Sequence, residues 1–217
     1  MTHLQRTLIV LALLVACFHP VCAQQPKEGS EEAIEAPSPD GKFAFRYTKD
    51  SKSNSESDSE KQTYDLIDKK SGRVLTSVAE SDPDLGPSAR FNMHVLWRPD
   101  SAAFALTATL WKRGSSVTVY VRDGSTFREI KIPELVADIP EKVKGGKSFP
   151  HVAELNSQSA TRWQKDGSLV VEIENMVDGN EGSITATRTV VLGFDRTDEA
   201  KVLKSTIKFA VEKPESD

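Results

Sequence analysis

The stretch LWRPDSAAFAL, residues 96–106, places a tryptophan three positions before an aspartate and then continues into an apolar, alternating run. Two further stretches follow the same scheme: APSPDGKFAFRY at residues 36–47 and TRWQKDGSLVVEI at residues 161–173. An aspartate side chain can accept hydrogen bonds from backbone N–H groups further along the chain, which favours a tight turn. Three turns of one kind, each followed by a strand-like run, predict three copies of one β-unit.

The three copies align on Asp40, Asp100 and Asp166. A tryptophan lies three residues before the second and third aspartates, as Trp97 and Trp163, and Pro37 takes that place in the first copy. The residues that follow the aspartates are Gly41, Ser101 and Gly167. We interpret these positions as structural: each turn joins two antiparallel strands, glycine tolerates the tight geometry, and the aromatic ring covers the joint from the core side.

The pattern resembles the Trp-Ser-Pro-Asp-Gly-Lys repeat of TolB-like, WD-like periplasmic β-propellers, in which each copy marks one blade. SPDGK (38–42) matches this repeat letter for letter, WRPDS (97–101) departs from it in two places, and WQKDG (163–167) keeps Trp, Asp and Gly. The copies lie farther apart than the roughly 40–45 residues of a propeller blade, and a ring usually needs at least about four blades. The resemblance therefore implies a partial propeller-like domain, with a two-sheet sandwich as the alternative.

Alternation of apolar and polar residues dominates the chain. It is clearest around Phe43 and Phe45, around Val117 and Val119, and around Ile207. Such alternation is typical of antiparallel strands with one buried face and one wet face. We predict a mainly all-β fold in which residues 37–211 form a single β-rich domain of antiparallel meanders packed face to face.

One segment has a different period. Ile132, Leu135, Val136, Ile139 and Val143 follow helical spacing, and a pair of glycines at 145–146 would end a helix. The pattern predicts one or two short helices near residues 133–158, with a break near Pro140 and a further turn within residues 149–159.

Residues 1–23 have the composition of a secretory signal peptide. Arg6 precedes an apolar stretch from Leu8 to Phe18, and a Val-x-Ala sequence ends at Ala23. We expect export to the periplasm or the extracellular space. In the alternative, LVAC acts as a lipobox and leaves a lipoprotein anchored through Cys17. We interpret residues 24–36 as an acidic linker and residues 212–217 as a flexible tail.

The charge balance excludes some partners. The chain has 28 basic and 32 acidic residues and a formal net charge of −4. Because no basic stripe is visible, nucleic acid is not an expected partner. A membrane is expected as a partner only if Cys17 is lipidated.

The histidine and acidic residues do not form the spacing patterns of a metal or catalytic site. His94 and His151 lie in no two-ligand spacing, so we expect no metal, no cofactor and no catalytic residue. Glu172 and Glu174 share one strand face. An alternative interpretation is therefore a secreted hydrolase that uses paired carboxylates.

Trp111 lies beside a predicted hairpin turn, and an aromatic side chain at such a tip is a candidate binding anchor. The sequence therefore favours an exported, non-enzymatic module that binds a protein or a component of the cell envelope. A structural subunit of an oligomeric β assembly is a further alternative.

Overall fold

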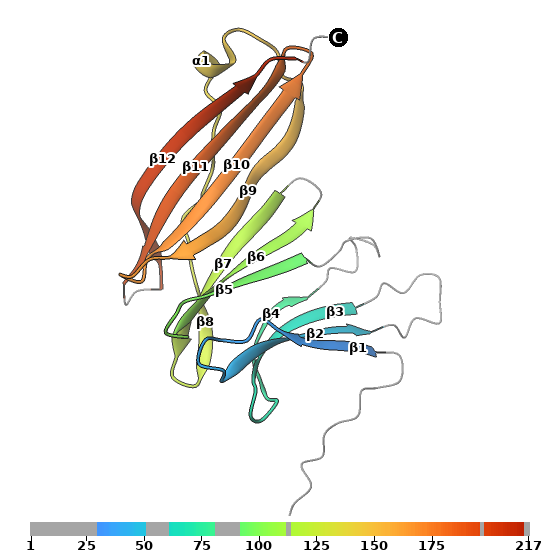
Figure 1. Ribbon diagram of the computed structural model, residues 1–217, viewed down its shortest axis with the longest axis vertical. Helices are drawn as coiled ribbons and strands as arrows, with labels where there is room; N and C mark the ends of the chain where they lie inside the picture. Colours follow the sequence, from blue (N-terminus) through green and yellow to red (C-terminus); the bar gives the residue numbers. More distant parts are fainter. Residues whose placement is uncertain (1–29, 51–60, 81–91, 112–113, 196–197, 215–217) are drawn as a thin grey trace, which may run out of the picture.

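The described part of the chain forms three four-stranded antiparallel sheets that follow one another along the molecule, the second lying between the other two (Figure 1). This computed structural model describes residues 30–50, 61–80, 92–111, 114–195 and 198–214. The predicted all-β class is confirmed, and so is its construction from antiparallel meanders. Within the described ranges the three sheets remain open.

Each sheet is a meander in which consecutive strands pair. The first sheet contains β1 (Ser30–Glu35), β2 (Phe43–Asp50), β3 (Lys61–Asp68) and β4 (Val74–Glu80). The second sheet contains β5 (Asn92–Trp97), β6 (Ala103–Trp111), β7 (Gly114–Asp123) and β8 (Thr126–Ile130). The third sheet contains β9 (His151–Trp163), β10 (Leu169–Gly179), β11 (Gly182–Phe194) and β12 (Ala200–Glu212). β1 and β12 are therefore outermost strands of their sheets.

The second sheet is buried on both faces. Phe104 and Tyr120 belong to a cluster shared with the first sheet, whereas Ala105 and Val119 belong to a cluster shared with the third. Successive side chains of a strand point to opposite faces. β6 therefore needs apolar residues at consecutive positions, and its sequence from Ala103 to Leu106 is apolar without interruption.

Aromatic rings fill the layer between the first and second sheets. Phe45 stacks on Tyr64 with ring centroids 4.9 Å apart and meets Phe104 edge to face at 5.1 Å. Phe104 also stacks on Tyr120 at 4.8 Å. Aromatic pairs in these arrangements add about 0.5–1.5 kcal/mol each to the burial of their apolar surface. This layer holds the first two sheets together.

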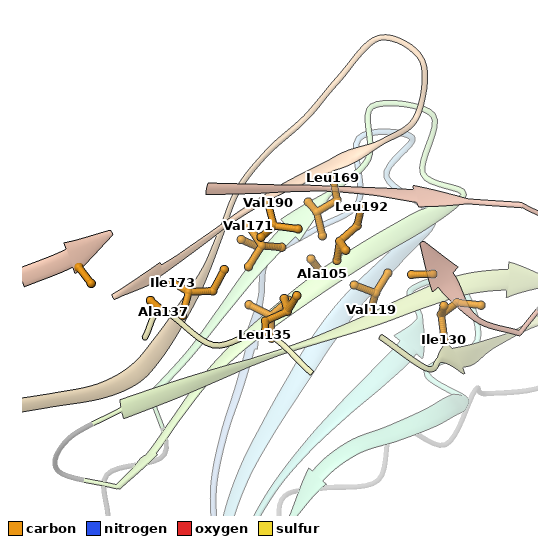
Figure 2. Close-up of a cluster of buried hydrophobic side chains, with 14 residues drawn as sticks. Ala105, Val119, Ile130, Leu135, Ala137, Leu169, Val171, Ile173, Val190 and Leu192 are labelled. Carbon is orange, nitrogen blue, oxygen red and sulfur yellow. The ribbon is translucent and has the colours of Figure 1, made fainter. Parts of the chain in front are cut away.

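Aliphatic side chains fill the layer between the second and third sheets (Figure 2). Leu169, Val171, Val190 and Leu192 of the third sheet are fully buried. They point toward side chains of the second sheet that include Val119 (Figure 2). Burying one such side chain stabilises the fold by about 1.5–3 kcal/mol.

The prediction of one or two short helices near residues 133–158 is confirmed by one short helix. This helix, α1 (Glu141–Lys144), begins directly after Pro140. The further turn expected within residues 149–159 does not form, because the chain enters β9 at His151 and continues as a strand to Trp163. Residues 133–139 have no regular secondary structure.

Residues 131–140 form a connector from the second sheet to the third. Leu135 and Ala137 are buried and Asp138 is exposed, which is the alternation of an extended chain. The Arg188 guanidinium donates a hydrogen bond of 2.8 Å to the Val136 carbonyl. The Asn156 side chain accepts one from the Ala137 N–H at 2.9 Å. Side chains of the third sheet thus form hydrogen bonds with backbone groups of the connector, which in a helix would bond to one another.

The expected linker at residues 24–36 is wrong for its second half, because Ser30–Glu35 pair with β2 as strand β1. The Tyr64 hydroxyl donates a hydrogen bond to Glu35, and burial together with this carboxylate raises the pKa of Tyr64. Residues 24–29 lie outside the described residues. The expected tail begins too early by one residue, since Glu212 belongs to β12.

Candidate binding surface

The three aspartates of the repeat occupy equivalent turns, each between the first and second strands of its sheet. The side chain of Asp40 accepts a hydrogen bond of 3.1 Å from the Lys42 N–H. Asp100 accepts one of 3.0 Å from the N–H of Ala102, and Asp166 accepts one of 3.0 Å from the N–H of Ser168. The aspartates therefore shape the turns, as their spacing in the sequence predicts.

Hydrogen bonds from side chains and from backbone N–H groups lower the pKa of all three carboxyl groups. For Asp40, burial acts in the opposite direction, but hydrogen bonds from Ser38 and Lys42 outweigh it and bring the pKa to about 2. The Arg98 side chain has the largest effect on Asp100, and the Ser168 hydroxyl has the largest effect on Asp166. Each carboxylate therefore accepts hydrogen bonds from residues of its own turn.

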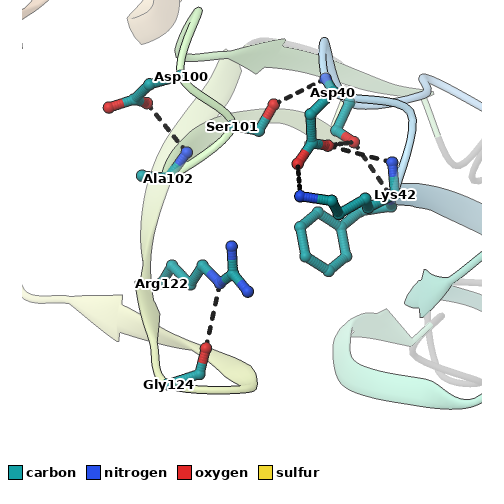
Figure 3. Close-up of polar contacts among 9 residues, drawn as sticks. Asp40, Lys42, Asp100, Ser101, Ala102, Arg122 and Gly124 are labelled. Carbon is teal, nitrogen blue, oxygen red and sulfur yellow. Dashed lines mark hydrogen bonds and ion pairs between the residues drawn. The ribbon is translucent and has the colours of Figure 1, made fainter.

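The residue after each aspartate has a left-handed backbone. The φ angle is +72° at Gly41, +59° at Ser101 and +84° at Gly167. Ser101 is buried, and its hydroxyl accepts a hydrogen bond of 3.0 Å from the Asp40 N–H in the first sheet (Figure 3). This contact ties two copies of the turn together.

The two tryptophans of the repeat also join neighbouring copies. Trp97 donates a hydrogen bond of 2.9 Å from its indole Nε1 to the Ala36 carbonyl, four residues before Asp40. Trp163 donates the same bond at 2.9 Å to the Leu96 carbonyl, four residues before Asp100. Each tryptophan therefore contacts the preceding sheet. Among the described residues no sheet precedes the first, and the first copy has Pro37 at this position.

Trp111 lies at the end of β6, where its backbone pairs with Gly114 of β7 across the hairpin. The placement of its side chain lies outside what the structure describes. Its role as a binding anchor therefore stays a prediction.

Glu172 and Glu174 line one shallow hollow on the outer face of the third sheet. Its volume is about 240 Å³, and the other lining residues are Ser157, Ser159 and Thr161. The two carboxylates thus share one face, as expected. Hydroxyl groups are their only other neighbours in the lining of this hollow.

Exposed apolar side chains are concentrated on β12. Of the seven large apolar residues that are exposed in the described structure, four belong to this strand: Val202 at 41%, Leu203 at 61%, Ile207 at 43% and Val211 at 57%. Ile207 and Val211 are cross-strand neighbours of Arg188 and Ile184, so they lie on the inner face of the third sheet. Exposed apolar side chains gathered in one place are typical of an interaction surface.

β12 also carries positive charge. Lys204 and Lys208 face away from the core and are exposed, and neither forms an ion pair within the described ranges. Lys201 is paired with Asp195 at 2.6 Å. We refer to the exposed residues from Lys201 to Val211 as the β12 surface. Alternation in the sequence identifies a strand but does not show that the strand lies at the edge of a sheet, so the sequence does not predict this surface.

Comparisons with known proteins give no independent assignment: no protein-family model and no curated protein matches the chain. Among the described residues, no group of three or more His, Cys, Asp or Glu side chains is placed to hold a metal ion. None of the helices described there is long and apolar enough to cross a membrane.

Proposed function

We propose that this protein is an exported, non-enzymatic module that binds a protein or a component of the cell envelope through the β12 surface. The observation that carries the proposal is the exposure of four large apolar side chains on one outermost strand. An outermost strand offers unpaired backbone N–H and C=O groups, which can pair with an added strand. Apolar side chains and free backbone groups together suit an extended segment of a partner.

Partner capture tests the proposal. The purified protein is immobilised, incubated with a native envelope fraction, and the bound proteins are identified by mass spectrometry. Ile207→Ser and the double variant K204E/K208E should each reduce recovery of the partner at least severalfold. K69E/K70E makes the same change in charge at exposed lysines of the turn between β3 and β4 and serves as the control. If the β12 variants recover the same partner in the same amount, binding does not use β12.

Trp111→Ala belongs in the same experiment, because Trp111 is the candidate anchor suggested by the sequence. Unchanged recovery would remove Trp111 from the binding surface and would leave the proposal for β12 intact. Lost recovery with Trp111→Ala alone would move the binding site to the hairpin between β6 and β7.

A secreted hydrolase is the second candidate, and the shared hollow of Glu172 and Glu174 favours it. Two carboxylates near each other can act as general acid and general base. Purified protein would be assayed for release of reducing sugar from envelope polysaccharides. Activity that disappears in both Glu172→Gln and Glu174→Gln would establish this function and overturn the first proposal.

Export is tested by the mass of the protein recovered outside the cytoplasm of producing cells. Cleavage of the signal peptide after Ala23 leaves a chain that begins at Gln24. A lipoprotein would begin at a lipidated Cys17, and Cys17→Ser would release it from the membrane.

A further inference from the structure

Two sheet edges at opposite ends of the molecule carry opposite charges (Figure 1). β1 is outermost in the first sheet and has three glutamates, Glu31, Glu32 and Glu35, but no basic residue. β12 is outermost in the third sheet and has three lysines, Lys201, Lys204 and Lys208, with one acidic residue, Glu212. All of these side chains are exposed.

We propose that β1 of one molecule adds to β12 of a second copy of this chain, so that the third sheet of one molecule continues into the first sheet of the next. The inference rests on the proposed function of β12 as a binding surface and names its occupant. Backbone hydrogen bonds would join the two strands, and the acidic edge formed by Glu31 and Glu32 would meet the basic edge formed by Lys204 and Lys208.

Apolar contact supports the same pairing. Ile34 of β1 has 60% of its side chain exposed, although its neighbours along the strand are polar or small. Ile207 and Val211 of β12 are also exposed. Pairing of the two edges would remove Ile34 and part of the β12 surface from water, which favours association.

The charges select this pairing over the symmetric ones. In a β12–β12 contact the lysines of two copies would gather along one edge, and in a β1–β1 contact the glutamates would do so. Like charges placed opposite each other destabilise strand pairs. Because β1 and β12 lie at opposite ends of the molecule (Figure 1), the contact is head to tail and can be repeated from molecule to molecule.

The size of the contact sets its expected strength. β1 contributes only six residues, so the interface is small and its affinity low. The charged groups are exposed, and salt screens such interactions over a distance of about 8 Å at physiological ionic strength. We therefore expect association that increases with protein concentration and decreases with added salt.

Sedimentation velocity of the purified protein tests the inference. The wild type should form larger species as its concentration rises at low salt, and added salt should reverse this. K204E/K208E makes β12 acidic, and E31K/E32K makes β1 basic, so each variant alone should remain monomeric. Glu35 is left unchanged because Tyr64 binds it. An equimolar mixture of the two variants should associate again, because both edges then meet an opposite charge.

K69E/K70E is the control and should associate as the wild type does. Restored association in the mixture also shows that both variants are folded. A wild type that stays monomeric at every concentration at low salt would overturn the inference, and so would a mixture that fails to associate. If the protein is monomeric but K204E/K208E still loses an envelope partner, the proposed function stands and this inference fails.

Discussion

Ser101 shows how a single residue can be kept in an unfavourable backbone conformation. The equivalent positions in the other two copies are glycines, Gly41 and Gly167, which adopt a positive φ without a steric penalty. Serine has a side chain that disfavours this conformation by about 1–2 kcal/mol. Its hydroxyl compensates by accepting a hydrogen bond from the Asp40 N–H. In the second copy, the backbone at Ser101 is therefore strained, and the Ser101 hydroxyl joins this turn to the turn of the first copy.

This balance predicts an unusual order of stabilities. Ser101→Ala keeps the strained backbone and loses the hydrogen bond, so it should lower the free energy of unfolding by about 1 kcal/mol. Ser101→Gly loses the same bond but relieves the strain, and should therefore be more stable than Ser101→Ala. Urea unfolding of the three proteins measures the order. An alanine variant as stable as the glycine variant would show that the backbone at this position is not strained.

The lowered pKa of Asp40 predicts a dependence of stability on pH. The folded pKa of about 2 lies below the value of about 3.9 for an unfolded chain. The ionised carboxylate therefore stabilises the fold above about pH 4, and this contribution is lost as the pH falls through about 2. Asp40→Asn should be less stable than the wild type at pH 6, by an amount that shrinks toward pH 2.

Chemical unfolding of both proteins at several pH values tests this expectation. Asp138→Asn, at an exposed position of the connector, removes one negative charge and is the control. A difference between wild type and Asp40→Asn that stays constant from pH 6 to pH 2 would contradict the assigned role of the carboxylate.

Among the secondary structure elements, the connector at residues 131–140 differs most from its prediction. Leu135 and Ile139 are four residues apart, which suits a helix, but Leu135, Ala137 and Ile139 are also two residues apart, which suits an extended chain. Both periods fit this short segment. Hydrogen bonds to Asn156, which accepts from the Ala137 N–H, and from Arg188, which donates to the Val136 carbonyl, favour the extended form. These two residues are too distant in sequence for local patterns to reveal them.

The connector should contribute strongly to stability through one side chain. Leu135 is 2% exposed and packs in the cluster between the second and third sheets. Leu135→Ala should lower the free energy of unfolding by about 2–4 kcal/mol. Val136→Ala, at the neighbouring half-buried position, is the matched control and should cost clearly less. Equal effects of the two variants would mean that the connector does not pack as described.

β1 and β12 show the limits of prediction for edge strands. β1 has a single large apolar residue, Ile34, so no alternation was available to identify it. β12 alternates clearly, but Ile207 is 43% exposed although its side of the strand was expected to be buried. Burial at an edge depends on which neighbour covers the strand, and that is a property of the tertiary arrangement. The candidate site lies on these strands, and for this reason the sequence did not predict it.

For the whole molecule, the aspartate turns and the alternation around Phe43, Val117 and Ile207 were sufficient to predict an all-β fold of stacked meanders. The sheets stack in the order in which they follow along the chain, because the indole groups of Trp97 and Trp163 each donate a hydrogen bond to the preceding sheet. The second sheet contributes Phe104 to one cluster and Val119 to the other. Without the second sheet, the apolar inner faces of the first and third sheets would be exposed to water.

This sharing of the second sheet predicts cooperative unfolding. Thermal unfolding followed by circular dichroism and by tryptophan fluorescence should give coincident, single transitions. Phe104→Ala weakens the aromatic layer between the first and second sheets. It should therefore lower the transition temperature seen by circular dichroism and by fluorescence by the same amount. Two separate transitions would show that one outer sheet unfolds independently of the rest.

The outer faces of the stack are mainly polar. Arg46 and Asp65 form an ion pair of 3.8 Å on the first sheet, and Glu172 and Glu174 lie among hydroxyl groups on the third. Of the three sheets that the structure describes, only the second has an apolar surface on both sides. Gene duplication could therefore lengthen this protein only by copying residues 92–130, since a duplicated end sheet would place charged groups between two layers.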